Sequence, residues 1–520
     1  MSIKQNNKQK PRVVVVGAGI GGLTAAALLA RRGYQVLVFD RAIVPGGCAS
    51  TFKRRGFTFD VGATQVAGLE PGGIHHQIFT ELEIDLPLAT PCDPACAVFL
   101  PGETEPINVW RDPQKWQIER QKQFPGSEPF WQLMAKLFAA SWKFQGREPV
   151  LPPRNLWDLW QLVSAVRLDT LITVPFTLMT VGDALRLYGL AKDKRLKTFL
   201  DMQLKLYSQV NADSTALLYA ATALAVSQSP QGLFHLQGSM QVLSDRLVKA
   251  LEKYGGKLFM RHNVESIKVE AGKAVGVTVR NQKTGEVWTE KADEVIANVT
   301  AQNLIKLAEI ENKTVSQNLY QQRIDKLPEA SGAFVIYLGV KREAIPSNCP
   351  PHLQFLYDYD GVIGENNSLF VSVSKPDDGR APVGCATIIA SSFTDVNMWW
   401  KGTKEDYEQL KQQYTQEAIE RLAQYFNLTP ETIIHQEAAT PRTFAYYTGR
   451  DKGIVGGIGQ RVSTFGPFGI ATRSPIKHLW LAGDSTHPGE GTAGVSYSAL
   501  TIVRQIEASN GVSEIYGGKN

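Results

Sequence analysis

The sequence predicts an α/β fold, and three observations support this prediction. Residues 12–41, RVVVVGAGIGGLTAAALLARRGYQVLVFDR, have the pattern of a strand, a Gly-rich turn, a helix and a second strand. A second Gly-rich turn, in HPGEGTAGVSYSAL at residues 487–500, also leads into an apolar helix. Between these loops, residues 331–450 contain several short apolar runs that are typical of strands. With 520 residues, the chain is long enough for two large cores.

The first loop predicts a dinucleotide site. Four consecutive valines indicate a buried parallel strand, and Gly17, Gly19 and Gly22 then form the G-x-G-x-x-G turn that opens a helix of small residues. The second strand ends on Asp40, about twenty residues beyond the glycines, where a βαβ unit places a carboxylate against the ribose hydroxyls. A carboxylate there repels a 2′-phosphate, which disfavours NADP.

The residues after this unit favour FAD over NAD. RAIVPGGCASTF, at 41–52, adds a second glycine pair, and GFTFDVGATQVAG adds a strand that ends at Gly62. A nicotinamide enzyme has no evident need for this second phosphate-side loop, whereas the ribityl and isoalloxazine parts of a flavin extend far enough to use it.

Together these motifs resemble the superfamily of FAD-dependent amine oxidases and phytoene desaturases. The resemblance implies that the last Gly-rich loop, which follows a strand ending at Asp484, closes over the ribityl chain and pyrophosphate. It also implies a backbone contact from Val264 beside the adenine. The last loop contains no cysteine, so FAD is expected to bind non-covalently. The residues expected to bind FAD are Gly17, Ala18, Gly19, Gly21, Gly22, Asp40, Arg41, Gly46, Gly47, Gly62, Ala63, Thr64, Val264, Asp484, Gly491, Thr492 and Gly494.

If both ends of the chain bind one cofactor, the Rossmann-like FAD-binding domain is discontinuous. We expect it to comprise residues 1–75, 235–310 and 470–510, and the amphipathic pattern of Leu243, Leu247 and Leu251 predicts a helix in its middle segment. Residues 76–234 and 311–469 are expected to form an inserted α+β substrate-binding domain. Its antiparallel sheet is predicted within 331–450, with a helix at about 404–426 and a mostly helical region at about 105–230.

Part of the helical region has two possible interpretations. NLWDLWQLVSAVRLDTLITVPFTLMTVGDALRLYGL contains Trp157 and Trp160 beside Arg154 and Arg167, and Pro175 interrupts it. It is either a membrane-facing segment or a buried core helix, and periodicity does not distinguish the two. No apolar run reaches the roughly 18 residues that span a bilayer. The five cysteines are scattered, which favours a reducing compartment. Together with the absence of a spanning run, this predicts a cytoplasmic protein that is held peripherally on a membrane.

Within the superfamily, the chain resembles the carotenoid branch along nearly its full length. SKPDDGRAPVG, TPRTFAYYTGR and HPGEGTAGVSYSA match the pattern of that branch, most closely the cyanobacterial type of carotenoid C-3′,4′ desaturase. The resemblance implies that a C-3′,4′ double bond is introduced into an acyclic-ended, 1′-hydroxylated carotenoid, with O2 or a quinone as electron acceptor. The alternatives are a carotenoid cis-trans isomerase that uses reduced FAD, and a non-enzymatic lipid escort protein. An escort protein would be expected to lose the cofactor glycines, which this chain retains.

The sequence identifies no catalytic residue. His487 and Glu490 in the last loop are candidate bases, although a loop carboxylate is more often solvated, and His75 and His76 are expected to lie in a surface loop. No metal is expected, because the pair of cysteines in PCDPAC is at most half a site. No nucleic-acid-binding signature is present, so nucleic acid is not an expected partner.

Overall fold

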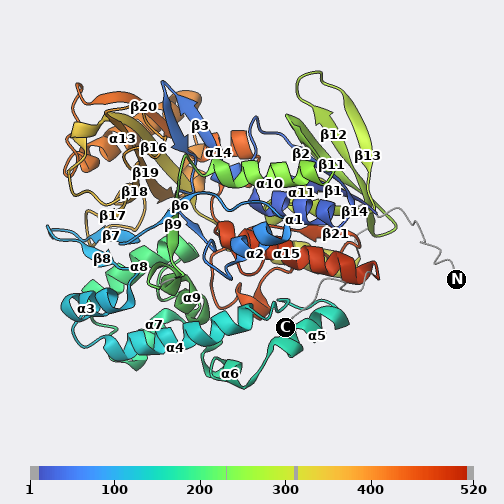
Figure 1. The fold of residues 1–520 in the computed structure, drawn as a ribbon, viewed down its shortest axis with the longest axis horizontal. Coiled ribbons are helices and arrows are strands. Elements are labelled where there is room, and N and C mark those ends of the chain that lie inside the picture. The colour runs from blue at the N-terminus through green and yellow to red at the C-terminus, as the bar shows by residue number, and fades with distance from the viewer. Residues whose placement is uncertain (1–10, 230, 310–313, 512–520) are drawn as a thin grey trace.

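The computed structural model describes residues 11–229, 231–309 and 314–511 (Figure 1). Residues 1–10 and 310 of the expected FAD-binding domain therefore lie outside the described residues. The α/β fold is confirmed, and its layers follow from three sheets.

The central sheet is parallel and has five strands. Their order is β10 (Lys257–Met260), β2 (Gln35–Asp40), β1 (Arg12–Val16), β14 (Glu294–Ala297) and β21 (Leu479–Leu481). All neighbouring pairs are parallel, and Val14 of β1 lies between Leu37 and Val295. The strands thus come from three distant stretches of the chain, and the predicted strand–helix–strand unit at 12–41 is confirmed.

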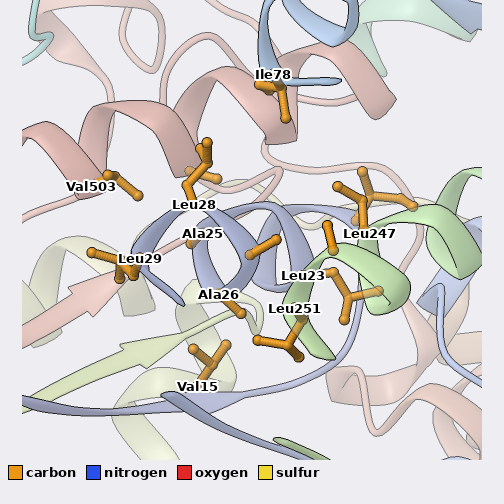
Figure 2. Close-up of a cluster of buried hydrophobic side chains, with 14 of the residues drawn as sticks. Val15, Leu23, Ala25, Ala26, Leu28, Leu29, Ile78, Leu247, Leu251 and Val503 are labelled. Atoms are coloured by element: carbon orange, nitrogen blue, oxygen red, sulfur yellow. The ribbon is translucent and has the colours of Figure 1, made fainter. Parts of the chain in front are cut away.

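Helices cover one face of this sheet. α1 (Ile20–Arg31) packs beside α15 (Thr492–Ser509) and α10 (Gln241–Lys253), with α2 (Ile74–Glu81) next to them (Figure 1). Figure 2 shows the contact, in which Leu28 approaches Val503 and α10 contributes Leu247 and Leu251. The predicted apolar face of α10 is confirmed, because its leucines are all buried. The opposite face is covered by the antiparallel hairpins of β11 (His262–Glu270), β12 (Lys273–Asn281) and β13 (Val287–Lys291), with the short β15 (Ala308–Glu309) beside β11.

The inserted region contains a seven-stranded sheet. Its strands, in order, are β20 (Ile433–Ala439), β16 (Gly332–Lys341), β19 (Cys385–Thr394), β18 (Ser368–Val373), β17 (His352–Leu356), β7 (Cys96–Phe99) and β8 (Ile107–Val109). The pairing is antiparallel except between β17 and β7, where it is parallel. Helix α13 (Lys404–Leu422) packs Tyr414, Ala418 and Leu422 into this core. The helix ends at Leu422, whereas the sequence pattern predicted its end at about Phe426.

The predicted helical region is confirmed, although it begins after β8 rather than at about residue 105. The helices of this region are α3 (Pro113–Gln123), α4 (Glu128–Gln145), α5 (Leu156–Ala165), α6 (Leu168–Leu171), α7 (Val181–Leu187), α8 (Lys194–Ser208) and α9 (Leu217–Ser227). All of them except α5 and α6 contribute to one core built around Trp116, Phe199 and Leu200.

Residues 156–178 of this region expose apolar side chains to solvent, and we call them the apolar stretch. It comprises α5, α6 and a short 3-10 turn, η2 (Val174–Phe176), at the lower edge of Figure 1. Leu156 is 85% exposed, Trp160 66% and Leu168 87%. Trp157 is half-buried, with the Arg504 guanidinium 5.7 Å from its ring. The buried-core interpretation is therefore wrong for most of this stretch.

Short elements connect these layers. The hairpin of β3 (Thr51–Arg54) and β4 (Phe57–Asp60) leads into residues 62–64, and β9 (Leu233–Leu236) joins β5 (Val66–Ala67) to β6 (Ala89–Pro91). The remaining helices are α11 (Ala301–Leu307), α12 (Val315–Asp325) and α14 (Pro441–Thr448). Within the described ranges, no helix combines the length and the apolarity needed to cross a membrane.

Candidate functional site

A cavity of about 1020 Å³ lies at the carboxyl ends of the central strands. Gly17 follows β1, Asp40 ends β2, Asn298 follows β14 and Asp484 comes shortly after β21. Ligands bind at this edge of parallel sheets. Of the residues predicted to bind FAD, all line the cavity except Ala18 and Gly22.

The glycines of the first loop permit close packing around Asn298. A Cβ atom at Gly22 would lie 2.2 Å from the Gly17 carbonyl oxygen, so this glycine allows the helix to approach the strand. At Gly19, a Cβ atom would lie 2.7 Å from Asn298 Nδ2, at the cavity wall. Gly17 has φ +98°, which disfavours other residues. Asn298 is a cavity residue that the sequence did not identify.

Two helices begin at the cavity without a capping side chain. The N-cap residue of α1 is Gly19 and that of α15 is Gly491, and neither has a side chain that can accept the first amides of its helix. By contrast, Thr403 caps α13 by accepting a hydrogen bond from the Asp406 amide. The free amides of α1 and α15 create a positive potential that suits an anionic group such as a pyrophosphate.

Asp40 connects the first loop to the end of β2. Its Oδ2 accepts a hydrogen bond from the Ala18 amide at 2.6 Å and its Oδ1 accepts one from the Ala42 amide at 2.7 Å. Burial raises the pKa of Asp40 above its usual value, while these amide hydrogen bonds oppose the increase. Each oxygen retains a lone pair that can accept a hydroxyl proton. The Ala18 backbone therefore holds the Asp40 carboxylate and does not form part of the cavity wall.

The last loop is anchored by an ion pair. Asp484 Oδ2 accepts a hydrogen bond from Arg450 Nη2 at 2.8 Å, and the same nitrogen donates to the Gly456 carbonyl at 3.1 Å. A Cβ atom at Gly457 would lie 2.1 Å from the Asp484 carbonyl oxygen. The glycine cluster at 453–461 therefore packs against the last loop.

The opposite end of the cavity is apolar. One wall is the seven-stranded sheet, which contributes Val335, Phe370 and Phe393, and another is formed by α8 and α9, which contribute Tyr207 and Tyr219. Thr64 connects the two ends, because it lines the cavity and its Oγ1 lies 2.7 Å from the Ser372 hydroxyl of β18. The carboxyl end of α4 adds further wall residues, including Trp142 and Gln145.

Glu490 is the acidic side chain of the last loop that lies between these two ends. Its Oε2 accepts a hydrogen bond from Gln209 Nε2 at 2.8 Å, and burial raises its pKa to about 8. His487 is buried, which lowers its pKa to about 4, and its Nε2 accepts a hydrogen bond from Gln145 Nε2 at 3.0 Å. Neither residue is a solvated loop side chain.

One further expectation about histidines was wrong. His75 is buried inside α2, where Nδ1 lies 2.7 Å from the Ala67 carbonyl oxygen and Nε2 lies 3.1 Å from the Ser496 hydroxyl. Its neighbours are α15 and the central core, and the sequence did not predict these contacts. Among the described residues, no cluster of three or more His, Cys, Asp or Glu side chains could hold a metal ion.

Comparison with known proteins identifies the family of this fold. The model of flavin-containing amine oxidoreductases matches residues 20–506. The chain belongs to that family. FAD is its cofactor, and the protein is an FAD-dependent oxidoreductase. The glycine cradle and the two uncapped helices fit this cofactor, because a dinucleotide requires close backbone approach and anion-binding amides.

The chain is also similar to individual proteins. The chain is 27% identical to the carrot (Daucus carota) protein named chloroplastic prolycopene isomerase, over 96% of this chain and 80% of that protein. It is 25% identical to the zeta-carotene-forming phytoene desaturase of Myxococcus xanthus, over 96% and 94% of the two chains. A solved oxidoreductase from Methanosarcina mazei has the same fold, with a TM-score of 0.63 and 17% identity over 95% of this chain and all of that one.

Proposed function

We propose that the cavity binds FAD non-covalently at its polar end and a carotenoid at its apolar end. The glycines of the first loop and the amides of α1 and α15 would hold the pyrophosphate, and Asp40 would hold a ribose. Val264 lies at the cavity wall on β11, where it suits the adenine. When bound, FAD supplies two-electron oxidation and reduction.

The apolar end carries the proposal for the substrate. A long hydrocarbon requires a channel without unpaired polar groups, and the walls of β16, β18, β19, α8 and α9 present mainly aliphatic and aromatic side chains. Two relatives, the carrot isomerase and the Myxococcus desaturase, are named for carotenoid reactions, which supports the same substrate class.

We propose that the reaction is desaturation at C-3′,4′ of an acyclic-ended, 1′-hydroxylated carotenoid. Loss of a hydride beside an existing polyene produces a delocalised cation, which makes the adjacent proton acidic. The chain then needs only to position the polyene end, exclude water and accept one proton. O2 or a quinone would regenerate the oxidised cofactor.

Isomerisation is the second candidate, because several of the relatives are named prolycopene isomerases, including proteins from carrot, Oncidium and Arabidopsis thaliana. Such a reaction is redox-neutral overall, whereas desaturation consumes an oxidant. The two functions therefore predict products of different mass.

The test is to incubate the purified, FAD-loaded protein with 1′-hydroxylated and unmodified acyclic carotenes and to separate the products. Desaturation predicts a product lighter by two hydrogen atoms that absorbs at longer wavelength. A product of equal mass with altered cis-peak absorption, formed only when FAD is reduced, would establish the isomerase instead.

We also propose that the apolar stretch rests on a membrane surface on the cytoplasmic side. Arg147, just after α4, donates hydrogen bonds to the Ala165 carbonyl oxygen and to Asp169, and thereby joins the cavity wall at α4 to α5 and α6. Arg154 and Arg167 are exposed beside this stretch and can approach lipid phosphates. A carotenoid could then pass from the bilayer to the cavity with little exposure to water.

A further inference from the structure

Glu490 occupies an unusual position for a carboxyl group. It lies on the loop between β21 and α15, directly before the N-cap residue of α15, and it lines the cavity. Oε2 accepts the hydrogen bond from Gln209, whereas Oε1 is buried and has no hydrogen-bond partner among the described residues. An unpartnered buried carboxyl oxygen is costly, so Glu490 is retained for a reason other than stability.

The surrounding chain holds Glu490 and Gln209 in a fixed arrangement. Gln209 has φ +66°, and its carbonyl oxygen accepts a hydrogen bond from Lys205 Nζ at 3.1 Å. A Cβ atom at Gly456 would lie 2.2 Å from both Gln209 Nε2 and Glu490 Oε2, so glycine leaves room for this pair. The hydrogen bond from Gln209 therefore holds the carboxyl group, and glycine at position 456 leaves room for it.

The charged and titratable groups near Glu490 come from four elements. Asp484 follows β21 and raises the pKa of Glu490, whereas Arg450, after α14, and Lys205, on α8, lower it. The Tyr219 hydroxyl on α9 is also within electrostatic range. Burial is the largest influence and raises the pKa to about 8, and the hydrogen bond from Gln209 is the largest influence that lowers it.

We propose that Glu490 is the catalytic base, and that its carboxylate accepts the proton which the carotenoid loses. This inference rests on the proposed desaturation. His487, the other candidate, is less suitable because its Nε2 already accepts from Gln145 and the residue is not part of the cavity wall.

The reaction balances with FAD as the oxidant. The carotenoid loses one hydrogen with its bonding electron pair, and these two electrons reduce FAD. The neighbouring C–H bond then gives its proton to the Glu490 carboxylate, and its bonding pair becomes the new double bond. Glu490 must be ionised before each turnover, so the rate should fall as the pH decreases through about 8 and should reach a plateau above it.

The test uses the FAD-loaded protein and three variants. Glu490→Gln keeps the size of the side chain and its contact with Gln209, Glu490→Asp keeps the acid, and Glu420→Gln makes the same chemical change on the exposed surface of α13. We expect Glu490→Gln to lower the rate of desaturation by about 100-fold or more, with unchanged FAD content. Glu490→Asp should retain a pH-dependent rate, and Glu420→Gln should match the wild type.

A second readout is independent of turnover. Infrared spectra of the wild type should contain a carbonyl band of a neutral carboxylic acid that disappears as the pH rises through about 8, and Glu490→Gln should lack this band. If the wild type desaturates the carotenoid and Glu490→Gln does so at the same rate and with the same pH profile, the role of Glu490 is refuted and the proposed function stands. A wild-type product of equal mass would refute both.

Discussion

The two ends of the cavity are built in different ways. At the polar end, glycines and helix amides from short contiguous motifs form the surface, and a side chain as small as a methyl group would collide with the backbone at Gly22 or Gly457. At the apolar end, side chains from β16, β18, β19, α8 and α9 form the wall. Backbone recognition is therefore local in sequence, whereas the substrate surface exists only after distant segments have folded together.

The largest effect should come from substitutions in the first loop, and its two glycines should fail differently. Gly22→Val would place its Cβ against the Gly17 carbonyl oxygen, which cannot move aside, so we expect more than about 3 kcal/mol of lost stability and little soluble protein. Gly19→Val meets only the end of the Asn298 side chain, so the fold should survive while FAD binding is lost. Circular dichroism and FAD content measure these outcomes. FAD at wild-type occupancy in Gly19→Val would contradict the placement of the pyrophosphate.

A second substitution tests the apolar end alone. Ala223 lines the cavity from α9, so Ala223→Trp should fill the channel and reduce carotenoid turnover at least about 10-fold while FAD remains bound. Ala225 lies on the same helix outside the cavity wall, and Ala225→Trp is the matched control. Equal turnover in both variants, measured by chromatography, would show that the substrate binds elsewhere.

Asp40→Ala should have a smaller effect on the polar end. The substitution removes a carboxylate that accepts hydrogen bonds from the amides of Ala18 and Ala42, and each such hydrogen bond contributes about 1.5–3 kcal/mol. We expect the dissociation constant for FAD to rise about 10- to 100-fold, as measured by fluorescence titration. Asp40→Glu should recover most of the affinity. An unchanged dissociation constant in Asp40→Ala would remove Asp40 from the site.

Much of the polar end could be predicted from the sequence, because a motif fixes its own backbone. The first loop and Asp40 were placed by spacing and the last loop by the family resemblance, and all three reach the cavity. Gln209 and Arg450 could not be found in this way, since their roles depend on contacts in the folded chain, Gln209 with Glu490 281 residues further on and Arg450 with Asp484 34 residues further on. The strands β16 to β20 lie within residues 331–450, where an antiparallel sheet was predicted. Strands β7 and β8 and the parallel β17–β7 pair, which joins residues far apart in the chain, were not predicted.

The apolar helices illustrate the same limit. α1 and α5 both have apolar sequences, yet Ile20 to Ala30 are all buried whereas α5 buries only Asp158 and Ala165. The contacts of α1 with α10 and α15 make the difference, and hydrophobic periodicity contains no information about such partners.

The smallest expected effect concerns the membrane. Trp160→Glu combined with Leu168→Glu should reduce binding to anionic liposomes about 10-fold or more without changing turnover in detergent, because both side chains are exposed. Leu319→Glu is the control, since Leu319 is 60% exposed on α12. Co-sedimentation measures the binding. Equal liposome binding by the double variant and the control would exclude the apolar stretch as the membrane contact.

The most direct test of the account is an anaerobic single turnover of the oxidised, FAD-loaded protein with a 1′-hydroxylated acyclic carotenoid. We predict that the flavin absorbance is bleached in proportion to the carotenoid consumed, and that mass spectrometry finds a product lighter by two hydrogen atoms for each flavin reduced. Conversion to a product of equal mass, with the flavin still oxidised or active only after prior reduction, would contradict the proposed desaturation.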